Sequence, residues 1–167
     1  MKTRKLTLMA MTMAVAMILS YIESQLPPLF VAVPAIKMGL ANIAVVYALY
    51  SLGFPAAVLI SLLRVFLVSV MFSPFGLAGL LYGGPGAALS LLGMALMKKT
   101  GLFSTVGVSV TGGVLHNIGQ IAMACVLLGT AQIAYYLPVL LVSGTVAGVL
   151  TGLAAAVLIK RIHIKGD

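Results

Sequence analysis

The feature that most constrains this chain is a succession of apolar stretches, most of them close to the ~20 residues that a helix needs to cross the hydrocarbon core of a bilayer. Charged residues, prolines and glycines divide the sequence into six such stretches. They run approximately over residues 6–22, 38–52, 55–72, 75–97, 102–128 and 137–159. The second is short, because Pro27, Pro28 and Pro34 interrupt the approach to it. We therefore expect an all-α fold, an integral membrane bundle of six transmembrane helices that forms a single domain over residues 1–167.

Composition excludes a surface suited to water. Hydrophobic residues make up 62% of the chain and charged residues 7%, whereas an ordinary soluble domain has roughly 25% charged residues. The net charge of +8 does not indicate nucleic acid as a partner, because the basic residues gather at the ends of the apolar stretches and are not interleaved with aromatic residues. The expected surroundings are the lipid bilayer, and the expected location is the plasma membrane.

The positions of lysine and arginine predict the orientation, since these residues are enriched in cytoplasmic loops. Six alternating spans that start from a cytoplasmic N-terminus also end in a cytoplasmic C-terminus. This arrangement places eight of the ten basic residues inside, namely Lys2, Arg4, Lys5, Lys98, Lys99, Lys160, Arg161 and Lys165. The two exceptions are Lys37, at the outer start of the second stretch, and Arg64, within the third.

Polar side chains within the apolar stretches gather in the outer half of the expected bundle. At 1.5 Å per residue, Arg64 lies about 14 Å from the cytoplasmic start of its helix, close to the midplane. His116, Asn117 and Gln120 lie roughly 20 to 27 Å along the fifth helix, and their spacing puts them on one helical face. A charge at such depth costs ~2.5 to 3.5 kcal/mol on insertion scales, so it needs a partner, a cavity or a function.

Glu23, Lys37 and Asn42 belong to the same outer half. We interpret the whole set as a pocket that opens to the outside and binds a small polar ligand, with Lys37 attracting an anion at the mouth. With Lys37 and Arg64 cationic, a ligand that bears a carboxylate or a phosphate would suit the pocket. The alternative is a polar network between helices, for example an ion pair of Glu23 with Lys37, that only fixes the packing.

Two stripes of small residues are candidates for close helix contacts. One comprises Gly144, Gly148, Gly152 and Ala156, at intervals of four in the last stretch. The other is the pair Ala10 and Ala14 in the first. Each stripe is explained either by packing within the chain or by the docking of another membrane subunit.

The sequence lacks the residues that several kinds of chemistry require. A glycine-rich phosphate loop with its lysine is missing, so the chain cannot energise transport by itself. The acidic residues are Glu23 and Asp167 alone, which argues against a magnesium site for diphosphate chemistry. His116 and His163 lie far apart in sequence, so we expect no shared metal site, no cofactor and no enzymatic activity.

The stretches PAIKMGLAN (residues 34–42) and HNIGQ (residues 116–120), together with the helix that carries Arg64, resemble the Gx transporter family. Members of that family are often labelled heptaprenyl diphosphate synthase component I, and the likeness spans nearly the whole chain. The family is similar to the substrate-binding S components of energy-coupling factor transporters, which have six helices and capture vitamins or related precursors.

The resemblance implies a substrate-binding subunit that takes up a vitamin or an isoprenoid or quinone precursor. It also implies a separate transmembrane coupling subunit with ATPases, and it assigns Ala10 and Ala14 to the contact with the coupling subunit. Two alternatives stay open at this point. One is a noncatalytic membrane subunit of a heptaprenyl diphosphate synthase, and the other is the membrane anchor of a redox assembly.

Overall fold

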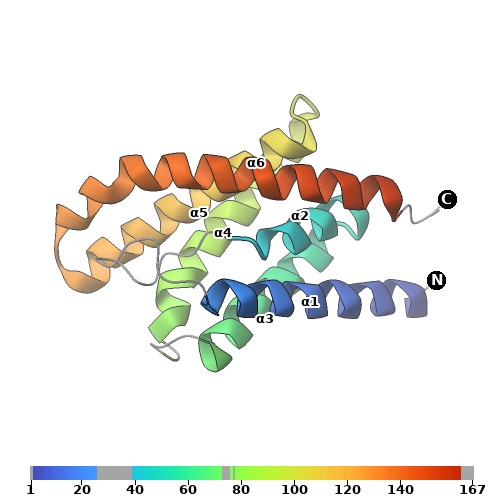
Figure 1. Ribbon diagram of the computed structural model, residues 1–167, viewed down its shortest axis with the longest axis horizontal. Coiled ribbons are helices and arrows are strands. Elements are labelled where there is room, and N and C mark those ends of the chain that lie inside the picture. Colours follow the sequence, from blue (N-terminus) through green and yellow to red (C-terminus); the bar gives the residue numbers. More distant parts are fainter. Residues whose placement is uncertain (1, 26–38, 73–75, 77, 163–167) are drawn as a thin grey trace.

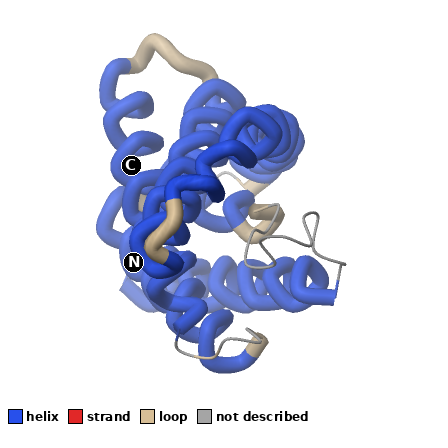
Figure 2. Tube along the Cα trace, turned by 90° about the vertical axis from the view of Figure 1, so that its left-hand side faces the viewer, coloured by secondary structure: helices blue, strands red, loops and turns tan. Residues whose placement is uncertain are grey.

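The chain is a bundle of helices in the computed structural model, which describes residues 2–25, 39–72, 76 and 78–162. Those residues form no strand. The helices are α1 (Lys2–Gln25), α2 (Asn42–Ser51), α3 (Phe54–Met71), α4 (Ala78–Thr100), α5 (Thr105–Leu128), the 3₁₀ helix η1 (Ala131–Tyr136) and α6 (Leu137–Arg161). Figure 1 shows the start of α1 and the end of α6 at the same end of the molecule, and Figure 2 shows the bundle turned by 90°.

Five segments are long and apolar enough to cross a membrane: Thr3–Gln25, Phe54–Met71, Gly79–Thr100, Thr105–Leu128 and Ala131–Arg161. The protein is therefore a multi-pass membrane protein. The helix α2 has only 10 residues and is about 15 Å long, which is half of a bilayer core. The structure thus confirms six α-helices, of which five are long enough to span the membrane. The count of six spans and the side of the membrane on which the termini lie stay predictions.

The start of α5 differs from its predicted position for a local reason. Ser104 caps this helix, because its side-chain oxygen accepts a hydrogen bond of 3.2 Å from the backbone N–H of Gly107. Leu102 and Phe103 are apolar and were expected to be helical, yet they precede the cap. An apolar run continues across a helix boundary without marking it, whereas a serine cap fixes it.

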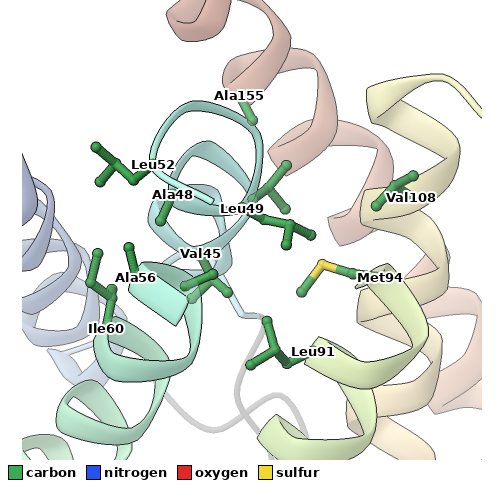
Figure 3. Close-up of a cluster of buried hydrophobic side chains, with 12 residues drawn as sticks. Val45, Ala48, Leu49, Leu52, Ala56, Ile60, Leu91, Met94, Val108 and Ala155 are labelled. Atoms are coloured by element: carbon green, nitrogen blue, oxygen red, sulfur yellow. The ribbon is translucent and has the colours of Figure 1, made fainter. Parts of the chain in front are cut away.

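The core is centred on α2, which contacts each of the five other α-helices. Six consecutive residues, Ala44 to Leu49, are buried, so α2 is apolar on every side. Figure 3 shows Val45 and Leu49 of α2 directed toward side chains of its neighbours, among them Ile60 and Met94. A helix enclosed in this way meets protein on all sides.

The C-terminal end of α2 is held by Lys98 of α4. The ammonium nitrogen Nζ of Lys98 donates a hydrogen bond of 2.6 Å to the backbone carbonyl oxygen of Leu49. The same nitrogen lies 4.8 Å from the centre of the Tyr50 ring, within the range of a cation–π contact. One cation thereby satisfies a carbonyl at the negative end of a helix inside the bundle.

The glycine stripe of α6 packs against α5. A Cβ atom would lie 2.9 Å from the carbonyl oxygen of Gly113 if placed at Gly144, and 2.6 Å from the Cα of Val110 if placed at Gly148. The next residue of the stripe, Gly152, is equally close to the backbone of α5. Packing within the chain is therefore the correct explanation for this stripe, and its glycine face is not free for another subunit.

The outward faces of the long helices are apolar. Large side chains such as Leu62, Leu96 and Val142 are more than half exposed. A soluble protein rarely exposes so much contiguous apolar surface. These faces are suited to lipid.

Candidate functional site

A small cavity lies where α2, α3, α5 and α6 meet. It is lined by Gly39, Asn42, Arg64, Gly113, His116, Asn117, Ala147, Gly148 and Thr151. The volume open to the centre of a water molecule is about 20 Å³, which is room for roughly one or two waters. The four helices therefore surround a small space that is lined mainly by polar residues.

Arg64 supplies the charge of this cavity from the middle of α3. Only 8% of its surface is exposed, although it is one of the cavity residues. None of the described residues makes a hydrogen bond with its guanidinium group. The carboxylate of Glu23 attracts it electrostatically, so the buried charge is compensated in part while its donors stay available to the cavity.

Glu23 joins the end of α1 to the start of α2. Its carboxylate oxygen Oε1 accepts a hydrogen bond from the backbone N–H of Gly39. Gly39 has a φ of +82°, a conformation that glycine adopts without strain. Glu23 does not line the cavity itself, but it is bound to a residue that does.

His116 packs against α4. Its ring lies beside Gly86, where an added Cβ would be 3.2 Å from the ring nitrogen Nδ1. Gly86 follows Pro85, which lies inside α4 and cannot donate a helical hydrogen bond. A Cβ at Gly86 would lie 2.7 Å from the backbone oxygen of His116, so only glycine permits this approach. The contact fixes the ring at the edge of the cavity.

Asn117 and Gln120 differ in their positions, although they share a face of α5. The side-chain nitrogen Nδ2 of Asn117 donates a hydrogen bond of 2.6 Å to the carbonyl oxygen of Leu140 on α6. Gln120 is buried against α4, close to Gly86, and is not among the residues that line the cavity. Its Oε1 atom is buried and has no hydrogen-bond partner among the residues that the structure describes.

Of the residues predicted for the site, four line the cavity together: Asn42, Arg64, His116 and Asn117. Glu23 adjoins it through Gly39, and Gln120 lies to one side. Lys37 falls outside the described residues. Whether any of them binds a ligand stays a prediction.

A match to the family model of heptaprenyl diphosphate synthase component I covers residues 12–158. The match includes every residue that lines the cavity. The chain belongs to the heptaprenyl diphosphate synthase component I family. Neither the search of curated proteins nor the search of solved structures finds a match to this member of the family.

The described part of the chain contains no group of three or more histidine, cysteine or acidic side chains that could hold a metal ion. The side chains that line the cavity offer two amides, one hydroxyl group, an imidazole and a guanidinium for hydrogen bonding. Such a set can bind a polar or anionic molecule directly, with no bridging metal.

Sequence reasoning missed the contribution of α6 to this cavity. Thr151 lines it, and the Thr151 hydroxyl oxygen lies 2.8 Å from the hydroxyl oxygen of the buried Ser109 on α5. Thr151 directly precedes Gly152 of the glycine stripe. A hydroxyl residue within a close-packed glycine face is the signal that would have found it, because such a face brings the hydroxyl group up to the next helix.

Proposed function

We propose that this chain is the substrate-binding subunit of an energy-coupling factor type transporter, similar to an S component, in the plasma membrane. It takes up a small molecule such as a vitamin or an isoprenoid or quinone precursor. The observation that carries the proposal is the buried Arg64, which faces a polar cavity and has no hydrogen-bond partner among the described residues. A purely structural bundle gains nothing from a charge in that position.

Binding of a vitamin-sized molecule requires the cavity to expand, because its volume of about 20 Å³ has room for only one or two waters. Two features of the site favour such a change. The Gly39 backbone joins α1 to α2 through one carboxylate, and the lining comes from four different helices. Separation of these helices admits the ligand, and their return encloses it.

Energy for release into the cytoplasm comes, in this proposal, from separate proteins. The sequence has no phosphate-binding loop. Ala10 and Ala14 are exposed on α1 and form the proposed contact with a transmembrane coupling subunit that is driven by ATPases.

The family match favours a second candidate, a membrane subunit of a heptaprenyl diphosphate synthase. In that role the chain is noncatalytic, because Glu23 and Asp167 are its only carboxylate side chains and diphosphate chemistry uses a cluster of carboxylates around magnesium. A soluble partner would then carry the catalytic residues.

Purification of the protein in lipid nanodiscs, followed by mass spectrometry of co-purifying small molecules, tests the first candidate. We expect one bound small molecule that is lost in Arg64→Gln and kept in Arg4→Gln, which removes an equal charge at the exposed start of α1. If nothing co-purifies and cells that carry Arg64→Gln take up all candidate vitamins normally, the transport proposal fails. Capture of a soluble prenyl synthase in the same purification would favour the second candidate.

A further inference from the structure

We infer that the molecule captured in the cavity presents a single carboxylate to Arg64 and is otherwise neutral. This inference rests on the proposed function and narrows the class of substrate. It derives from the geometry of Arg64, from the position of α2 and from the charge that Glu23 already places beside the site.

The guanidinium group of Arg64 is a planar set of five N–H donors. The side chain is 92% buried, since 8% of it is exposed, and it lines the cavity. None of the described residues accepts a hydrogen bond from these donors. A carboxylate or a phosphate matches such a donor set, because either group accepts two parallel hydrogen bonds from one guanidinium.

The N-terminus of α2 adds a partial positive charge to that of Arg64 at the same cavity. Gly39 directly precedes the first turn and Asn42 opens the helix, and both residues line the cavity. The N-terminus of a helix carries a partial positive charge that favours anions. The buried Arg64 and the positive end of α2 therefore converge on one space.

Glu23 limits how much negative charge this space accepts. Its carboxylate is bound to the N–H of Gly39 and attracts Arg64, so one negative charge is already present. A diphosphate brings more than one further negative charge, and the described residues supply neither a second cation at the cavity nor a metal site to balance it. At low dielectric this excess is costly, and among anionic ligands a single carboxylate leaves the smallest excess of negative charge.

The remaining lining suits an uncharged polar body. Asn42 and Thr151 supply an amide and a hydroxyl group, and the Oδ1 atom of Asn117 is a further acceptor. The apolar part of the lining comes from Ala147 and from three glycines. The substrate class is accordingly a small monocarboxylic acid with neutral hydrogen-bonding groups.

Thermal unfolding in nanodiscs with matched probes tests this inference. The probes are acetate and benzoate, their amides acetamide and benzamide, and isopentenyl diphosphate. We expect the acids, at up to about 10 mM, to raise the unfolding temperature, and the amides and the diphosphate to leave it unchanged. Arg4→Gln should respond like the native chain.

Three substitutions at two positions test the predicted direction of the effect. Arg64→Gln should abolish the response to the acids, and Arg64→Lys, which keeps the charge but loses the paired donors, should weaken binding by about tenfold. Glu23→Gln keeps an oxygen for the N–H of Gly39 but removes the competing charge, so it should tighten acid binding by about tenfold. Size-exclusion chromatography checks that each variant is folded. If Arg64→Gln does not fold, Arg64→Lys still tests the role of the paired donors.

The inference is overturned if neither acid raises the unfolding temperature, if the diphosphate binds more tightly than the acids, or if Glu23→Gln weakens acid binding. Arg64-dependent binding of the diphosphate or of an amide would leave the capture function standing and refute only the charge class. Absence of any probe binding, together with absence of a co-purifying molecule, would refute both.

Discussion

The side-chain nitrogen of Asn117 donates a 2.6 Å hydrogen bond to the backbone carbonyl oxygen of Leu140 and so ties α5 to α6 beside the cavity. Leu140 is completely buried. Its carbonyl also accepts a hydrogen bond of 3.1 Å from the hydroxyl group of Ser143. Asn117 is thus a packing residue and a lining residue at once.

Substitution of Asn117 by leucine should lower the free energy of unfolding by about 1 kcal/mol, the usual worth of an interhelical hydrogen bond in a membrane protein. Unfolding in mixed micelles with increasing denaturing detergent measures the change. Gln132→Leu, at an exposed residue of η1, is the control. Unchanged stability combined with lost ligand binding would instead make Asn117 a ligand contact alone.

Gly148→Ala should destabilise the pair of helices α5 and α6 by about 1 to 3 kcal/mol, the usual cost of overpacking. The added methyl group would lie 2.6 Å from the Cα of Val110, and a backbone atom cannot move aside as a side-chain end can. Gly84→Ala is the matched control, because a Cβ there meets nothing within 4 Å. Equal unfolding temperatures for the two variants would show that α6 can shift without loss.

Lys98→Met should loosen the end of α2, because it removes the hydrogen bond to the Leu49 carbonyl and the contact with Tyr50. We expect faster amide hydrogen exchange in the last turn of α2 and a loss of about 1 to 2 kcal/mol. Lys99→Met removes the same charge from the adjacent exposed position. Hydrogen exchange that is equally fast in both variants would contradict a specific role for Lys98.

Replacement of Ala10 and Ala14 by leucine should block association with a coupling subunit and leave the unfolding temperature unchanged, because both side chains are exposed on α1. Co-purification from membranes with the tagged double variant measures association. Leu62→Ala, at an exposed position of α3, should associate normally. A fall in stability would assign the two alanines to packing within the chain.

Much of this structure follows from the cost of polar groups in lipid. Arg64, His116 and Asn117 interrupt apolar runs, and a polar residue at such depth needs a polar neighbour. The sequence could therefore predict that they lie near one another, as they do around the cavity. The long helices could be predicted for the same reason, because the bilayer sets their length.

The pairing of helices could not be predicted in this way. Gln120 is one helical turn from His116 and shares its face, yet α4 approaches so closely at Gly86 that Gln120 packs against it and lies outside the cavity lining. The position of Thr151 at the cavity could not be predicted either. Its hydroxyl group donates to the Gly148 carbonyl of its own helix, as threonines in membrane helices commonly do, so its presence at the cavity follows only from the packing of α6.

The enclosure of α2 by other helices has a consequence for how this protein fits its bilayer. Hydrophobic mismatch concerns helices that face lipid, and α2 has protein on every side. The thickness of the membrane therefore does not constrain the length of α2. Non-helical backbone at membrane depth is tolerated where it is buried in protein or lines a cavity, and Gly39 lines the cavity. By placing its shortest helix at the centre, the bundle brings one helix end to the polar cavity, while the surrounding helices remain long enough to cross the bilayer.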